Sequence, residues 1–180
     1  MTKRQERMTL NALRIFGGLL IIAGCVIAAS TASRAVGTLN AEDFVNKASV
    51  GNQFELESSR MALQKTKNDE IKEFAQQMVN DHTETATKLK TTLSLPDAEV
   101  PMPNNKLDAK HENILKTLRE TSPGQAFDKK YIQAQKEAHN EAIALFKTYA
   151  ENGDNSPLKS FATETLPTLE EHRKMIPEIK

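Results

Sequence analysis

Apolar side chains recur every three or four residues through most of residues 41–176, and this spacing constrains the fold more than any other feature of the chain. It is the period of an α-helix that buries one face. No stretch shows the strict alternation of apolar and polar residues that is typical of a half-buried strand. The sequence therefore predicts an all-α fold.

Capping residues and helix breakers divide this region into five predicted helices. They span residues 41–66, 69–93, 107–120, 125–152 and 157–175. Asn40, Asn68 and Ser156 are the predicted N-caps, and Pro157 takes the first position of the last helix. Only a few residues join the first two helices and the last two, so each pair is expected to form an antiparallel hairpin. We therefore expect a four-helix bundle of two hairpins, connected by a proline-rich loop and the short helix.

Residues 1–33 are predicted to be an export segment, followed by a linker at 34–40 and the bundle at 41–176. A basic stretch, the apolar run Ile15–Ala29 and a small polar stretch follow one another in the order of a secretory signal, although the run is short for a membrane span. Cys25 ends a lipobox-like sequence and would carry the lipid of a lipoprotein. A cleaved signal, a lipid anchor and a retained membrane anchor all remain open. Each places the bundle outside the cytoplasm.

The charge distribution bears on possible partners. The chain holds 24 basic and 24 acidic residues, but the first 40 residues are basic, so the bundle itself is mildly acidic. It has no Trp and no basic cluster, so nucleic-acid binding is not expected. The membrane, reached through the N-terminal segment or a lipid, is the one partner that the sequence indicates. Because Cys25 is the only cysteine, the bundle offers no thiolate as a ligand or nucleophile.

Four polar residues fall on the predicted inner faces of the long helices. They are Glu55, His82, His139 and His172. Counted from the turn of its own hairpin, each lies about 12 to 17 residues away, so the members of each pair differ by roughly 3–5 Å along the bundle axis. If the hairpins pack in register, the four side chains meet in one layer. Imidazole and carboxylate groups in such a layer suit Zn, Cu, Fe or Ni, so the four are candidate metal ligands.

A simpler interpretation stands beside this one. Each histidine could be a core residue with one hydrogen-bonded partner, and Glu55 could pair with a histidine or with a surface cation. Asp81 and Glu171, which precede two of the histidines, are candidates to hold those rings or to line an entrance to the site, but the favoured expectation places both on the solvated face. His111, on the short helix, is expected at the surface.

Several segments resemble a known family. They are residues 41–56 (AEDFVNKASVGNQFEL), 74–83 (FAQQMVNDHT), 127–131 (FDKKY) and 161–172 (FATETLPTLEEH). Together they are similar to the domain of unknown function 4142, a family of exported bacterial proteins often labelled as predicted outer-membrane proteins. The resemblance implies a ferritin-like bundle and an envelope location, and it implies no established activity.

The spacing of acids and histidines argues against one common use of ferritin-like bundles. Paired Glu-x-x-His motifs hold di-iron centres in such proteins. Here the residues three positions before the histidines are Val79, Lys136 and Leu169, none of them acidic. We therefore expect a non-enzymatic envelope protein that binds a metal ion or small ligand, or supports stress tolerance. The alternatives are a structural or interaction module without metal and, less favoured by the motifs, a metal-dependent redox enzyme.

Overall fold

The computed structural model describes residues 39–178, and within them every regular element is a helix. The five helices are α1 (Ala41–Lys65), α2 (Asp69–Leu93), α3 (Ala109–Glu120), α4 (Gln125–Asn152) and α5 (Ser156–Met175). The predicted all-α fold is confirmed. The expected export segment and Cys25 lie outside the described residues. Among residues 39–178, no helix combines the length and the apolar character needed to cross a membrane.

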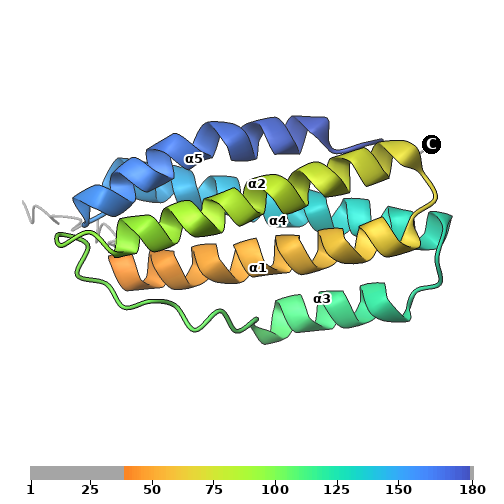
Figure 1. Cartoon of the computed structure of the whole chain (residues 1–180), viewed down its shortest axis with the longest axis horizontal. Coiled ribbons are helices and arrows are strands. Elements are labelled where there is room, and N and C mark those ends of the chain that lie inside the picture. Colours follow the sequence, from red (N-terminus) through yellow and green to blue (C-terminus); the bar gives the residue numbers. More distant parts are fainter. Residues whose placement is uncertain (1–38, 179–180) are drawn as a thin grey trace, which may run out of the picture. The chain divides into compact units, whose positions relative to one another are not determined.

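The four long helices form a bundle of two antiparallel hairpins (Figure 1). Helix α1 packs against α2 and α4, and α5 packs against the same two helices from the opposite corner. Because α2 and α4 run in the same direction, the chain between them must return along the whole bundle. Helix α3 lies in that return segment and packs on the outside of α1. This arrangement, with one long crossover, is the predicted ferritin-like bundle.

Side-chain caps fix where the helices begin. The side chains of Asn40 and Asn68 accept hydrogen bonds from backbone N–H groups in the first turns of α1 and α2, as predicted. Two predicted helix starts were wrong by one or two residues. Asn155, not Ser156, caps α5, and Asp108 caps α3, which starts at Ala109 instead of residue 107. In both cases the side chain of the residue before the helix accepts a hydrogen bond from a backbone N–H of the first turn.

A layer of buried polar side chains divides the core into two apolar clusters. The cluster near the α1–α2 turn is built around Phe54, Met78 and Tyr131. The other lies toward the α4–α5 turn, where Phe44 stacks on Tyr149 with ring centroids 4.0 Å apart. The polar side chains of the layer between them come from four helices. They are Glu55, Ser58, His82, Gln135, His139 and His172.

The apolar face of α2 is buried except at one position. Ala86 is exposed, although the helical period places it beside buried Leu89. The neighbouring stretch of α1 carries the small residues Ala48 and Gly51, so the side chains there do not fill the space between the helices. Ala86 is therefore not part of the core, and a hollow lies beside it.

Candidate metal centre

Three helices bring one histidine each to the same point in the core. His82 comes from α2, His139 from α4 and His172 from α5, and each is 1–4% exposed. One ring nitrogen from each lies within 4.8 Å of the other two. The ring centroids are 5.5–5.8 Å apart. Residues that are distant in the sequence thus form one compact group of imidazoles.

Each imidazole is held by a hydrogen bond from the nitrogen that points away from the group. The donor and acceptor pairs are His82 Nδ1 to the Asn52 side-chain oxygen at 3.0 Å, His139 Nδ1 to the Gln135 carbonyl at 3.0 Å, and His172 Nε2 to Asp81 Oδ2 at 2.8 Å. All three partners are oxygen acceptors, so the proton of each neutral ring is on the outer nitrogen. In that neutral form the inner nitrogens are lone-pair donors. Outer partners of this kind orient the histidine ligands of metal ions in proteins.

The inner nitrogens carry the strongest indication of a ligand. His82 Nε2, His139 Nε2 and His172 Nδ1 are buried and have no hydrogen-bond partner among the described residues. Leaving a buried polar atom unpaired costs about 1–3 kcal/mol. Ligands at about 2.0–2.1 Å in tetrahedral geometry lie about 3.4 Å apart. Shortening each nitrogen–nitrogen distance by about 1.4 Å or less would therefore give the spacing of ligands in a metal site.

Glu55 lies in the same layer but behind one of the histidines. Its carboxylate is 4% exposed, and Oε1 is 3.3 Å from His139 Nδ1, on the outer side of that ring. The His139 N–H donates to the Gln135 carbonyl, and neither Glu55 oxygen accepts a hydrogen bond from the described residues. Glu55 is also absent from the group of three whose ligand atoms lie within 4.8 Å of one another. Its assignment as a fourth ligand stays a prediction, and its position is that of a charge partner to His139.

Glu55 and His139 stabilise each other's charged forms. Burial by itself raises the pKa of Glu55, but the attraction of His139 and then of His82 outweighs it and lowers the pKa below its ordinary value. Burial by itself lowers the pKa of His139, and the adjacent Glu55 raises it above its ordinary value. The other two rings behave differently: burial lowers the pKa of His82 to about 4 and lowers that of His172. His82 and His172 are therefore neutral at pH 7, as metal ligands must be.

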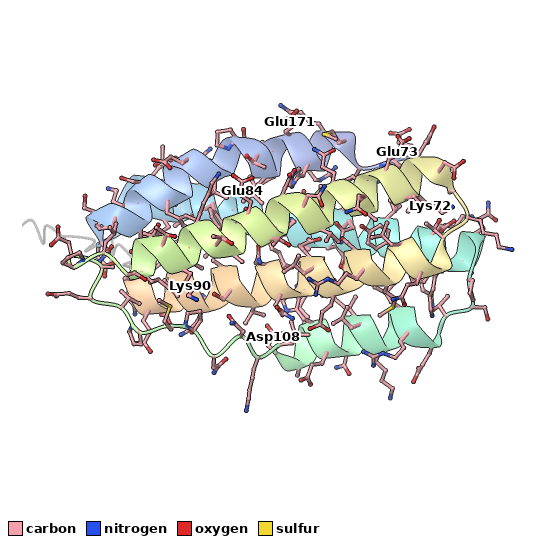
Figure 2. The ribbon with its side chains drawn as sticks, in the orientation of Figure 1. Lys72, Glu73, Glu84, Lys90, Asp108 and Glu171 are labelled. Carbon is pink, nitrogen blue, oxygen red and sulfur yellow. The ribbon has the colours of Figure 1, made fainter. Side chains whose placement is uncertain are left out.

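Two expectations about neighbouring residues were wrong. Asp81 is not a freely solvated acid, because its half-buried carboxylate accepts the hydrogen bond from His172. His111 is not at the surface: its side chain is 12% exposed, pairs with Asp108 and packs against the Phe54 ring. Glu171 is exposed as expected and projects from the outer edge of α5 (Figure 2).

The helical periodicity did not single out Asn52 or the Gln135 carbonyl as partners of the site. Asn52 precedes Glu55 by three residues and so shares its helix face. Gln135 precedes His139 by four residues, the spacing at which a side chain reaches the backbone of its own helix. These two sequence spacings were the signals from which the contacts with the histidines could have been predicted.

Comparison with known proteins identifies the family. Residues 27–179 match the domain of unknown function DUF4142. The chain belongs to this family. The match covers the whole bundle of this DUF4142 protein and confirms the resemblance noted in the sequence. No curated protein matches the chain.

A solved structure with the same fold is described as CopM in the Cu(II)-bound form. It shares 18% sequence identity with the DUF4142 protein, covering 76% of this chain and 93% of that one, with a TM-score of 0.62. At this level of identity the similarity shows a common helical fold.

The hydrogen bonds to the rings predict opposite tautomers for His82 and His172. In the metal-free DUF4142 protein at pH 7, the neutral His82 ring carries its proton on Nδ1, facing Asn52, and the neutral His172 ring carries it on Nε2, facing Asp81. Long-range ¹H–¹⁵N correlation spectra of the imidazoles distinguish these forms. The same tautomer at both positions would contradict the described orientation of one ring.

Proposed function

We propose that this DUF4142 protein is a cell-envelope protein that binds one transition-metal ion, with copper preferred, through His82, His139 and His172. The observation that carries the proposal is the set of three buried, unpartnered imidazole nitrogens that face one another. A cation at their centre would satisfy all three at once. The proposed role is to hold the metal, as in sequestration or protection from metal stress, without catalysis.

The chemistry of the donors supports copper over iron. Imidazole nitrogen suits Cu, Zn, Fe and Ni, and for most such sites Cu(II) binds most tightly of the divalent first-row ions. The Cu(II)-bound state of CopM, which has the same fold, also supports copper. Among the described residues, only Glu55 offers a buried carboxylate beside the histidines, and Glu-x-x-His pairs are missing. A carboxylate-bridged di-iron site has too few ligands here.

The envelope location rests on the N-terminal segment. Residues 1–33 have the order of a secretory signal, and Cys25 offers a site for a lipid anchor. Either fate, or retention as a membrane anchor, would place the metal centre where external metal arrives first. Mass spectrometry of the mature N-terminus would separate the three.

One observation favours the structural alternative. Each of the three histidines already makes one hydrogen bond, which is the usual state of a core histidine. In that case the layer would serve only to set the register of the four helices. The two functions differ in whether the inner nitrogens bind a metal.

A copper titration tests the proposal. We expect the purified protein to bind one equivalent of Cu(II) and to show electron paramagnetic resonance with nitrogen superhyperfine splitting from imidazoles. At a free concentration of 100 times Kd, binding should raise the free energy of unfolding by about 2.7 kcal/mol. The control variant His111→Ala, which removes a histidine outside the group, should behave as the wild type. No binding, or equal binding by the triple variant His82→Ala, His139→Ala, His172→Ala, would sink the proposal.

The Asp81 contact gives a second, smaller prediction. Asp81→Ala removes the acceptor that orients His172 and is expected to weaken Cu(II) binding by about 10- to 100-fold. Glu171→Ala is the matched control, because Glu171 also adjoins a site histidine in sequence but is exposed. Isothermal titration calorimetry measures both. Equal affinities for the two variants would show that Asp81 does not support the site.

A further inference from the structure

A hollow of about 1000 Å³ extends from the histidine layer toward the beginning of α1. Most of the surface that lines it is apolar. The lining includes Ala48, Gly51, Ala86, Leu89 and Phe146. A Cβ atom placed on Gly51 would meet nothing within 4 Å, so the space next to this residue is open. The space corresponds to a small-molecule site in size, since such sites are about 300–1000 Å³.

The inner end of the hollow is polar and unsatisfied. Glu55, His82 and His139 line it, and all three are at least nine-tenths buried. Both Glu55 oxygens and the Nε2 atoms of the two histidines have no hydrogen-bond partner among residues 39–178. Lys90 and Asp108, labelled in Figure 2, lie on the lining closer to solvent. An apolar chamber with polar groups at its inner end fits a ligand of matching polarity.

The metal centre proposed above leaves a coordination position for such a ligand. Three histidines supply three donors, whereas Cu(II) and Zn(II) take four or more ligands, and open sites hold water or substrate in the fourth position. The hollow touches two of the three histidines. A molecule in the hollow would therefore lie beside the ion that these histidines hold.

We propose that the hollow binds a small, mainly apolar molecule whose polar end carries a lone pair and an N–H or O–H group. The lone pair is directed at the metal ion, and the N–H or O–H donates to the unpaired Glu55 carboxylate or, in the metal-free protein, to His82 Nε2. The contact with metal rests on the proposed function. The walls and the unpaired Glu55 and His82 atoms are present in the metal-free protein, so the hollow also binds the molecule without metal, more weakly. The apolar body lies between α1 and α2, against Gly51 and Ala86.

Binding of 4-phenylimidazole tests this proposal. This probe combines a phenyl ring with an imidazole, which carries one lone-pair nitrogen and one N–H. We expect it to saturate at one equivalent and to change the Cu(II) resonance of the loaded full-length protein. Gly51→Leu, which places a side chain in the hollow, should weaken binding by about tenfold or more, since apolar pockets discriminate by 10–200-fold per methylene. Ala86→Leu, on the facing helix, is a second blocking variant should the first fail to fold.

Two controls distinguish binding in the hollow from binding at the metal ion alone. Azide is small enough to reach the metal past a leucine, so it should bind wild type and Gly51→Leu equally. Gln64→Leu, an exposed position on the same helix, should leave 4-phenylimidazole affinity unchanged. Equal 4-phenylimidazole binding by wild type and both blocking variants overturns the proposal. A wild-type protein that binds azide but does not bind 4-phenylimidazole overturns it as well.

The hollow can be tested whether or not the protein binds copper. If the protein takes up no Cu(II), the proposed function fails, and the hollow is then tested by the thermal stability of the metal-free protein. A rise in Tm with 4-phenylimidazole in the wild type that is lost in the blocking variants supports the hollow. No rise in the wild type overturns it.

Discussion

Single replacements of His82, His139 or His172 by alanine are expected to weaken Cu(II) binding by about 100-fold or more. Loss of an outer partner of a ligand commonly costs 10–100-fold, and loss of the ligand itself should exceed this. Each change also leaves two donors on two helices, too few to define a closed geometry. The three variants should lose comparable affinity, because the three inner nitrogens are equivalent in burial and in lacking a partner.

Competition titrations with a chelator of known affinity measure these losses. His111→Ala is the matched control, since it removes the fourth histidine of the described residues while leaving the group intact. Circular dichroism of each variant separates loss of a ligand from loss of the fold. Retention of wild-type affinity by any one of the three variants would exclude that histidine as a ligand.

Acidification is expected to destabilise the metal-free protein by about 3 kcal/mol through His82 alone. Burial holds the pKa of His82 at about 4 in the folded protein, against 6.5 when the chain is unfolded. One pKa unit corresponds to 1.36 kcal/mol. Because the folded state disfavours the protonated ring, the unfolded state takes up the proton first. The stabilising contribution is complete above pH 6.5 and is lost as the pH falls toward 4.

The neighbouring titratable groups do not reverse the direction of this loss of stability with falling pH. Burial also lowers the pKa of His172, which adds to the loss in the same pH range. The raised pKa of His139 gives stability that is present below pH 6.5 and lost only at higher pH. The contribution of Glu55, whose pKa is lowered, is lost only below about pH 4.5. The range from pH 6.5 to 4 therefore reports mainly on His82 and His172.

Urea unfolding at pH 7 and pH 4 measures this effect. His82→Leu, which fills the position with an apolar side chain that does not titrate, should lose about 3 kcal/mol less than the wild type between the two values. His111→Leu is the control and should retain the wild-type loss. A wild type whose unfolding free energy is unchanged between pH 7 and pH 4 would show that solvent reaches the ring of His82.

The polar layer gives the bundle a weak point in its own core. Three unpaired imidazole nitrogens and a buried carboxylate replace apolar contacts between the two clusters. Such a layer lowers the stability of the metal-free protein, and binding of a cation would offset the loss. Stability and metal content are thus expected to rise together.

The helices and their pairing were determined by local features of the sequence. The 3.6-residue period fixes which side of a helix a residue occupies, and Asn40, Asn68 and the short turns fix where the helices begin and reverse. These rules placed His82, His139 and His172 on inner faces at one level. The bundle follows from them because a helix with one apolar face must pack against others.

Only the tertiary structure decided which nitrogens face inward, where Glu55 stands and where the core is empty. Periodicity locates a side chain to within a few ångströms, whereas a metal ligand and a partner behind it differ by about that distance. Asn52 and Asp81 became partners of the site because the packing of four helices and the ring rotamers brought their oxygens to 2.8–3.0 Å from the histidines. The hollow beside Ala86 likewise depends on how neighbouring helices fill space, which no single helix encodes.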